Sequence, residues 1–456
     1  MKGEKNRKRK EKKSKIKNLK KVEKTIKINL YPGRRKRKEL LKAQRENTKL
    51  ANELIKLRSK KDSYNSFHKK VYYKFREWGF HSQVQQATQR RVFAAKKVKK
   101  GFKIIPLEFN FPRSAKISYS NRGNPLLFVS PYKKRIALPI ILDGAYKRLL
   151  SYLEDGWQKK SCILYCRKGK WEAHIVISIE TPEPYTPEGT VGVDLGEVVL
   201  AAVTLNHPSL PLEEFYRGKE IIYKLKKFQA RRAHLQHLVD KGFSSDARRA
   251  YKTIKKLWFK EKHFVLTRCE QIAHEIVSLA YCTHSAVVVE ELRYIRKRFS
   301  KRYLSNFPGA RNLRRRLNRW IYGYFYTFLL RVCSLYGVPF VAVPPHHTSQ
   351  RCSRCGRVTK SARVTRSLYV CPHCSLTVHS DRNASRNIAY RGIILLGLPL
   401  YSSWFFYSHL TFPCERTARF VQFPRWGVIG PPFRRHDHSP SQETVKRSSI
   451  NTSRIF

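Results

Sequence analysis

The chain has 456 residues, enough for two or three domains with a substantial core. Its 95 Lys and Arg outnumber its 32 Asp and Glu, which gives a formal charge of +63 and indicates a polyanionic partner. Nucleic acid is expected, because each phosphate that a Lys or Arg neutralises releases a counterion; an anionic membrane surface is the weaker alternative. Ten Cys without a secretory signal argue against a disulfide-linked secreted protein and favour a reducing compartment.

The N-terminal part is basic and then largely helical. Residues 1–24 are rich in Lys and Arg, and we expect them to form a disordered tail that contacts phosphates without sequence preference. Alternating apolar residues predict a strand over 25–31, and leucines at helical spacing predict a helix over 34–60. The aromatic-rich segment 64–80 is expected to pack a small helical core, with some rings free to stack on bases.

From about residue 102 the pattern changes to strands. Residues 104–111 predict one strand, and residues 162–165 and 174–179 predict a hairpin across a polar turn. The Pro-rich segment 181–189 then marks a domain boundary.

Beyond this boundary the elements alternate between strands and helices. Residues 190–205 predict a strand, a turn and a second strand, and the apolar run 286–289 predicts a buried parallel strand. An apolar helix is expected over 320–336 and another strand over 339–343. This order predicts an α/β domain.

The C-terminal tail contains a long uncharged segment. No Asp, Glu, Lys or Arg occurs between Gly392 and Cys414, a length that would allow a membrane span. The Pro, Ser and His residues within it argue against a span and favour a partly packed tail.

Two Cys-x-x-Cys pairs carry the strongest chemical signal. Cys352, Cys355, Cys371 and Cys374 have the spacing of a closed tetrahedral zinc site, which is structural rather than catalytic because four thiolates leave no open position. The nearby histidines at 346, 347 and 373 are weaker alternative ligands.

Three carboxylates occupy positions that suggest a second metal. Asp194 lies in an apolar strand, Glu290 ends another, and Asp381 follows the cysteine pairs. Taken singly, they could be a turn residue, a surface charge and a helix N-cap. Together, in so basic a chain, they predict a Mg²⁺ site that would hydrolyse a phosphodiester. Glu291 competes with Glu290, but neighbours in a strand face opposite sides, so only one of the two can point at the metal.

These residues occur in an order that resembles the TnpB family, the transposon-encoded RNA-guided nucleases related to type V CRISPR effectors. The resemblance covers about residues 25–390 and is firmest over 190–390. It is carried by Gly-Val-Asp-Leu-Gly, Val-Val-Val-Glu-Glu-Leu, Thr-Ser-Gln-x-Cys-Ser-x-Cys-Gly, Cys-x-x-Cys and Asp-x-Asn-Ala-x-x-Asn-Ile.

The resemblance implies a fold of the α/β plus β-barrel class and a set of domains. It implies an N-terminal wedge β-barrel interrupted by a helical recognition domain, and a RuvC-like RNase H fold with an inserted zinc ribbon. The expected domains are a tail (1–24), the wedge (25–180, with the insertion at about 34–100), the nuclease domain (190–345), the ribbon (346–378), the last RuvC motif (379–390) and an extension of unknown role (391–456).

The resemblance also implies the activity, the cofactors and the partners. It places Asp194, Glu290 and Asp381 on the catalytic acids of a Mg²⁺-dependent DNA endonuclease, with structural zinc on the four Cys. The implied partners are a guide RNA from the transposon end and target double-stranded DNA with a short adjacent motif. A monomer bound to RNA is expected, in the cytoplasm or on the nucleoid, or in an organelle or nucleus of a eukaryote.

Two alternatives remain, and a departure from the family pattern keeps the first of them open. The family commonly has Asp-Arg-Asp-x-Asn-Ala, whereas this chain has His379-Ser380-Asp381-Arg382-Asn383-Ala384 and keeps only the second acid. The first alternative is a nuclease-silent, guide-bound DNA-binding protein that acts as a repressor. The second is an unguided RuvC-type nuclease.

Overall fold

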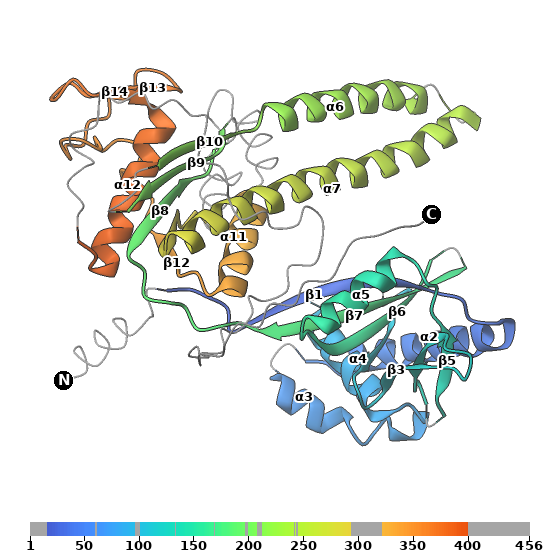
Figure 1. Cartoon of the computed structure of the whole chain (residues 1–456). Coiled ribbons are helices and arrows are strands. Elements are labelled where there is room, and N and C mark those ends of the chain that lie inside the picture. The colour runs from blue at the N-terminus through green and yellow to red at the C-terminus, as the bar shows by residue number, and fades with distance from the viewer. Residues whose placement is uncertain are drawn as a thin grey trace, which may run out of the picture.

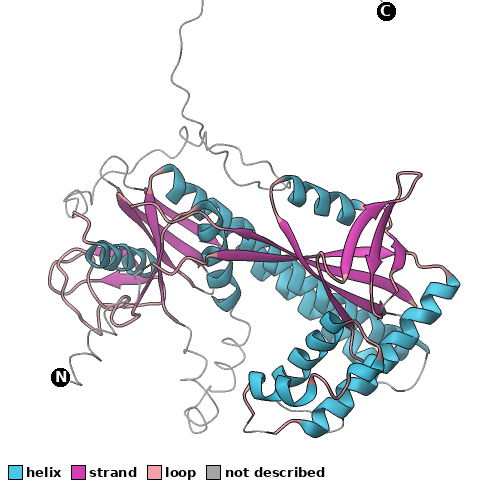
Figure 2. Ribbon diagram, turned by 90° about the horizontal axis from the view of Figure 1, so that it is seen from below, coloured by secondary structure: helices cyan, strands magenta, loops and turns pink. Residues whose placement is uncertain are grey.

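The computed structural model describes residues 16–399, with gaps at 60–61, 96–100, 133, 168, 197–198, 208–211, 241, 243–244 and 293–321. These residues form two lobes, each with a sheet and its own hydrophobic core (Figure 1). Figure 2 shows the two lobes side by side in a second view. The predictions for residues 1–15 and 400–456 lie outside the described part of the chain.

The N-terminal lobe contains two antiparallel sheets. The first has the strand order β1-β7-β6-β2 and the second the order β3-β4-β5. The predicted hairpin is confirmed as β6 and β7, which pair from Gln158↔Ser178 to Arg167↔Lys170 with a register shift between Lys159 and Ser161. The strands are β1 (Lys21–Leu30), β2 (Leu107–Asn110), β3 (Ala115–Tyr119), β4 (Pro125–Val129), β5 (Ile136–Pro139), β6 (Gln158–Arg167) and β7 (Lys170–Glu180).

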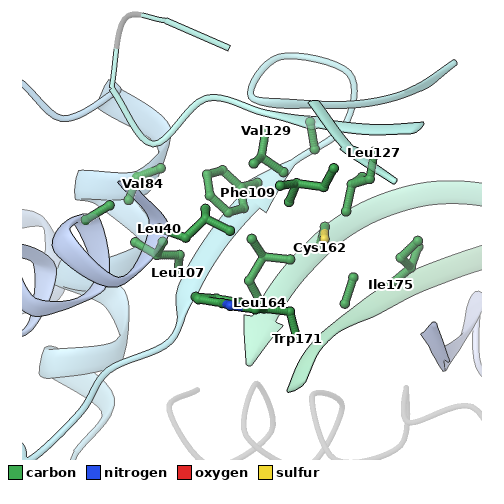
Figure 3. Close-up of a cluster of buried hydrophobic side chains, with 14 of the residues drawn as sticks. Leu40, Val84, Leu107, Phe109, Leu127, Val129, Cys162, Leu164, Trp171 and Ile175 are labelled. Atoms are coloured by element: carbon green, nitrogen blue, oxygen red, sulfur yellow. The ribbon is translucent and has the colours of Figure 1, made fainter. Parts of the chain in front are cut away.

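The segment of the chain between β1 and β2 is mostly helical. The predicted long helix is confirmed as α2, and its buried residues recur at helical spacing. Figure 3 shows Leu40 of α2 and Val84 of α4 packed against side chains of β2, β4, β6 and β7, so the helices and both sheets share one core. The helices are α2 (Arg34–Leu57), α3 (Tyr64–Val71), the 3-10 turn η1 (Arg76–Trp78), α4 (Ser82–Ala94) and, between β5 and β6, α5 (Gly144–Glu154).

The C-terminal lobe is built on one mixed sheet with the strand order β10-β9-β8-β11-β12. Strands β8, β11 and β12 are parallel, β9 runs antiparallel to β8, and β10 runs antiparallel to β9 and so in the direction of β8. The predicted alternation of strands and helices is confirmed here. The strands are β8 (Gly189–Asp194), β9 (Val199–Asn206), β10 (Leu212–Arg217), β11 (Ser285–Glu290) and β12 (Phe340–Val343).

Helices cover both faces of this sheet. Val287 and Val289 of β11 pack in the core formed with α7 and α11, while Ala286 and Val288 share a second core with Ile388 of α12. Helices α6 and α7 form a long hairpin that projects from the lobe (Figure 1). The helices are α6 (Lys219–Asp240), α7 (Ser245–Cys282), α11 (Tyr322–Tyr336) and α12 (Ser380–Leu396).

The expected disordered tail was wrong over residues 16–24. Strand β1 already begins at Lys21, and Ile16 bridges Val341 at the edge of β12. The backbone amide of Lys17 donates to the carbonyl of Phe340 (2.9 Å), and the side chain of Asn18 bonds the backbone on both sides of Pro339. An open strand edge has unpaired donors and acceptors, and this basic segment satisfies them.

The possible membrane segment is only partly described. Helix α12 ends at Leu396 and is followed by Gly397 in the left-handed conformation (φ 71°). Within the described residues, no helix is both long enough and apolar enough to cross a bilayer.

Candidate metal centres

The four predicted zinc ligands lie together. Among the described residues, Cys352, Cys355, Cys371 and Cys374 are the only group whose ligand atoms all lie within 4.8 Å of one another. The Sγ atoms of Cys352 and Cys374 are 3.5 Å apart, and those of Cys355 and Cys371 are 3.6 Å apart. Tetrahedral zinc with Zn–S bonds of about 2.3 Å requires S···S separations of about 3.8 Å, so the donor set fits zinc.

Two equivalent turns hold these cysteines. In each turn the amide four residues after the first Cys donates back to the carbonyl of that Cys at 3.0 Å: Gly356 to Cys352, and Ser375 to Cys371. Both turns need a left-handed residue, which is Gly356 (φ 76°) in the first and Ser375 (φ 56°) in the second. The turns are therefore local structures that short sequence motifs can encode.

A small core and the local amides support the thiolates. Strands β13 (Leu368–Val370) and β14 (Thr377–His379) pair beside the cluster, and the buried Tyr369 packs against it. Burial acts to raise the pKa of Cys371, but the backbone amides of Cys374 and His373 outweigh it and lower that pKa to about 7. A low pKa favours the thiolate form that binds zinc, whereas burial raises the pKa of Cys352 and Cys374, so in the metal-free protein this effect applies to Cys371 and not to those two.

The three alternative histidine ligands stay outside the cluster. The Nδ1 atom of His373 lies 2.9 Å from Arg357, and that of His347 lies 3.0 Å from Gln350. None of the histidines at 346, 347 and 373 belongs to the group of close ligand atoms found in the described part of the chain.

Asp194 and Glu290 end two neighbouring parallel strands. Strands β8 and β11 pair up to Val193↔Val289, so the two carboxylates follow at the same level. Gly192 and Val288 face α12, and each lies two residues before one of the carboxylates, Asp194 and Glu290 respectively. Because side chains alternate along a strand, residues two apart face the same side. Both carboxylates therefore lie on the α12 side of the sheet, at its carboxyl edge, where sites form in α/β folds.

Close packing brings Asp381 to the same edge. A Cβ atom on Gly192 would lie 2.3 Å from the carbonyl of Ser385, and one on Gly392 would lie 2.4 Å from Val288, so both glycines allow α12 to touch the sheet. The hydroxyls of Thr204 and Ser385 also meet at 2.6 Å. Asp381 lies in the first turn of the helix docked in this way.

His379 and Ser380, which depart from the family pattern, have structural roles. The Nδ1 atom of His379 accepts the amide of Asp381 (3.2 Å), which makes His379 the N-cap of α12. Ser380 is buried, and its amide donates to the carbonyl of Ser367 (2.9 Å). The N-cap that the sequence allowed for Asp381 is thus taken by His379, which leaves the Asp381 carboxylate for another role.

The three carboxylates influence one another electrostatically. Burial raises the pKa of Asp194 well above the usual aspartate range, and the negative charges of Glu290 and Asp381 raise it further. Burial likewise raises the pKa of Glu290, against a hydrogen bond from Thr348. Burial also raises the pKa of Asp381, although nearby His379 and Arg363 act in the opposite direction.

This electrostatic conflict fits a divalent cation. Three oxygen donors that repel one another at a half-buried strand edge are stabilised by a hard cation such as Mg²⁺. The carboxylates are neighbours but are more widely spaced than the cysteine ligands, since they do not form a group within 4.8 Å. Among the described residues, the guanidinium of Arg363 lies 3.8 Å from the carboxylate of Asp381 and supplies a nearby positive charge.

Glu291 does not compete for this site. Its carboxylate bonds Lys17 at 3.0 Å, and its amide donates to the carbonyl of Val343. The choice of Glu290 over Glu291 that sequence alternation allowed therefore agrees with the contacts in the structure.

Several polar residues around the site gave no separate signal in the sequence. Asn387 and Asn383 of α12 bond the backbone that leads into the first cysteine turn, and Thr348 in that segment bonds Glu290. The only sequence signal for Thr348 and the two asparagines is that they lie within the motifs that carry the family resemblance.

The α6–α7 hairpin and α11 expose aromatic rings next to lysines. Tyr251 and Trp258 of α7 are 53% and 49% exposed, and lie two helical turns apart on one face. Lys255 lies 4.4 Å from the ring centre of Tyr251, and Lys262 lies 5.5 Å from that of Trp258 and 5.6 Å from that of Tyr324. Such a surface combines charge for phosphates with rings that can stack.

Comparison with known proteins agrees with this arrangement. A family model described as the Cas12f1-like TNB domain matches residues 322–388, which run from α11 to α12 through the cysteine turns. A solved structure of a Cas12f1-sgRNA-target DNA complex superimposes with a TM-score of 0.58 and 14% identity, covering 81% of this chain and 99% of that one. The chain thus has the fold of Cas12-like effectors.

Curated relatives carry related names. The chain is 26% identical to the CRISPR-associated endodeoxyribonuclease Cas12f1 of Sulfoacidibacillus thermotolerans, covering 60% of this chain and 64% of that protein. It is 27% identical to the putative RNA-guided DNA endonuclease InsQ of Escherichia coli, covering 63% and 66%. It is 26% identical to the TnpB-like protein MJ0751 of Methanocaldococcus jannaschii, covering 37% and 57%. The matches therefore span less than two thirds of each relative.

These matches show that the chain is related to TnpB-like and Cas12f1 proteins. The resemblance expected from the sequence motifs is confirmed by the matched domain and by these relatives.

Proposed function

We propose that this protein is an RNA-guided DNA endonuclease encoded by a mobile element, which cuts target DNA beside a short adjacent motif. The observation that carries the proposal is the meeting of Asp194, Glu290 and Asp381 at one strand edge in a chain of charge +63. The names of the relatives, an endodeoxyribonuclease and an RNA-guided DNA endonuclease, support it.

The three carboxylates are proposed to hold Mg²⁺. The ion would supply charge stabilisation and an activated water for hydrolysis of a phosphodiester. Asp194 and Glu290 lie on fixed strand ends, so they orient the site, while Asp381 enters on the helix that docks over Gly192. Arg363, next to Asp381, is placed to meet a DNA phosphate that approaches the site.

The domain roles follow from this assignment. The mixed sheet and α12 are proposed to be a RuvC-like RNase H nuclease domain over 190–345, completed by residues 379–390. The cysteine turns form an inserted zinc ribbon over 346–378. The two-sheet lobe is proposed to be a wedge β-barrel over 25–180, and α2, α3 and α4 to be its helical recognition insertion.

The partners are proposed to be a guide RNA from the transposon end and double-stranded target DNA. The Lys-flanked rings of Tyr251, Trp258 and Tyr324 supply a surface on which nucleic acid can bind by charge and stacking. One chain is proposed to bind one RNA, in the cytoplasm or on the nucleoid, or in an organelle or nucleus of a eukaryotic host.

Cleavage by a co-purified complex tests this function. The chain is co-expressed with RNA transcribed from its own flanking DNA, purified, and mixed with Mg²⁺ and a plasmid library that matches the guide beside randomised bases. We expect cuts that depend on the guide and on Mg²⁺, and that disappear in Asp194→Ala while DNA binding remains.

The other outcomes identify the two alternatives. A bound RNA with target binding but no cuts would indicate the nuclease-silent repressor. Cuts that need no RNA would indicate an unguided nuclease. Cleavage by Asp194→Ala would remove the metal-site assignment.

A further inference from the structure

The segment between β12 and the first cysteine turn is fixed by α12. The Nδ2 atom of Asn387 donates to the carbonyls of Thr348 (2.8 Å) and Arg351 (2.7 Å). Asn383 also donates to the Arg351 carbonyl (2.8 Å), and its Oδ1 accepts the amide of Ser353 (2.9 Å). Both asparagines are at most 2% exposed, so these bonds are shielded from water.

This fixed segment carries one hydroxyl into the carboxylate site. Thr348 is 4% exposed, and its Oγ1 donates to Oε1 of Glu290. Its other acceptor within reach, the carbonyl of Pro345, is 3.3 Å away and therefore weaker. A bond to one carboxylate oxygen leaves the second oxygen, Oε2, for a cation.

Thr348 also restricts how Glu290 can turn. A glutamate side chain has three rotatable bonds, and a free carboxylate at a strand end would sample several rotamers. The hydroxyl stands on a backbone that Asn387 holds, so it offers Glu290 one bonded orientation. The first cysteine turn is tied to the same backbone through Arg351 and Ser353.

We propose that Thr348 is a positioning residue of the carboxylate metal site, and that its hydroxyl, carried by the segment clamped between α12 and the first cysteine turn, orients Glu290 toward the cation. This inference rests on the proposed function, because it requires the carboxylates to bind a metal. A residue of the segment between β12 and the first cysteine turn would then affect the carboxylate metal site.

Manganese binding to the purified full-length protein tests this role without a cleavage assay. Mn²⁺ suits the same oxygen ligands as Mg²⁺, and the electron paramagnetic resonance signal of free Mn²⁺ gives the bound fraction. Four proteins with confirmed zinc content and melting temperature are compared with wild type: Thr348→Val, Thr348→Ser, Asp194→Asn and Thr377→Val. Thr377 is an exposed threonine of the same ribbon whose hydroxyl lies 3.5 Å from the carbonyl of Ser375 in its own turn, so it is the matched control.

We expect Thr348→Val to weaken Mn²⁺ binding about 10- to 100-fold, the usual cost of removing a partner of a metal ligand. Thr348→Ser keeps the hydroxyl and should bind close to wild type, and Thr377→Val should be unchanged. The Ser rescue separates the hydroxyl from packing, because Ser lacks the methyl group that Val retains.

Two results would overturn the role of Thr348. The first is wild-type affinity in Thr348→Val while Asp194→Asn loses binding. The second is equal weakening in the Val and Ser variants, which would assign the effect to packing. If Asp194→Asn binds Mn²⁺ as wild type does, the proposed metal site itself fails, and the positioning role fails with it.

Discussion

The two candidate metal centres are built in opposite ways. The cysteine ligands come from two short turns within residues 352–374, each closed by its own backbone hydrogen bonds. The carboxylates come from positions 194, 290 and 381, on two strands and a helix that only tertiary packing brings together. From its local construction we expect the first centre to depend on bound zinc for folding, whereas we expect the surrounding fold to hold the second centre against the repulsion of its own charges.

The largest expected effect tests the dependence of the ribbon on zinc. Cys371→Ser removes a thiolate from the four-ligand cluster, and zinc binding in such small units supplies about 10–16 kcal/mol of apparent folding free energy. We expect loss of bound zinc and unfolding of residues 346–378, measured by metal analysis and protease sensitivity. Cys282→Ser, at an exposed free cysteine, is the control. Unchanged zinc content and melting would refute the structural role.

The second effect tests whether packing holds the carboxylate centre. Gly192→Ala would push a methyl group against the backbone of α12 at Ser385 and Ala389. Overpacking of this kind costs about 1–3 kcal/mol of unfolding free energy and should displace Asp381. We expect a lower melting temperature and reduced cleavage with unchanged zinc content. Gly323→Ala, which meets nothing within 4 Å, should cost no stability. Normal cleavage by Gly192→Ala would show that α12 need not dock so closely.

The third effect uses the raised pKa of Asp194. The pKa of the Asp194 carboxyl is higher in the folded state than in the unfolded state. Such a group lowers the free energy of unfolding as the pH rises above its pKa in the unfolded state. Asp194→Asn should therefore raise the melting temperature of the metal-free protein at pH 7, and the gain should vanish as pH falls toward 4. Added Mg²⁺ should stabilise wild type and not the variant. A variant less stable than wild type at pH 7 without metal would contradict the account of charge strain.

The smallest effect concerns the difference between the two cysteine turns. Ser375 has a left-handed conformation (φ 56°) that costs a non-glycine residue about 1 kcal/mol, whereas the first turn uses Gly356. Ser375→Gly should stabilise the ribbon by about this amount, and Gly356→Ser should destabilise it by a similar amount, as measured by thermal melting. The two substitutions exchange the same residue types at equivalent positions, so the opposite signs of their changes in melting temperature provide an internal control.

The sequence predicted the cysteine centre more completely than the carboxylate centre, because only the cysteine centre is built from short local motifs. Cys-x-x-Cys spacing encodes its geometry locally, so the four cysteine ligands could be inferred directly and the histidines ranked as weaker alternatives. For the carboxylates, strand alternation allowed only one of Glu290 and Glu291 to face the metal. The family resemblance was needed to choose Glu290 and to assign Asp194 and Asp381 as the other catalytic acids. The contacts that assemble the centre, such as Gly192 against Ser385, are tertiary and have no local pattern.

The fold likewise contains elements that the local sequence predicts and elements that depend on distant contacts. The hairpin of β6 and β7 and the helix α2 follow from apolar periodicity within one segment, and the strand β11 follows from a continuous apolar run. The role of residues 16–19 was missed because their basic composition resembles a free tail. Only the distant strand β12 supplies the edge that orders them.

Iron-mediated backbone cleavage would test most directly whether the three distant carboxylates share one metal. Fe²⁺ binds oxygen ligands that hold Mg²⁺ or Mn²⁺, and with ascorbate and peroxide it cuts the polypeptide close to where it is bound. The account predicts three sets of fragments from the zinc-loaded protein, ending near residues 194, 290 and 381. Excess Mg²⁺ and the Asp194→Asn substitution should suppress all three together. Fragments near only one of these positions, or cuts that Mg²⁺ does not suppress, would contradict a shared site.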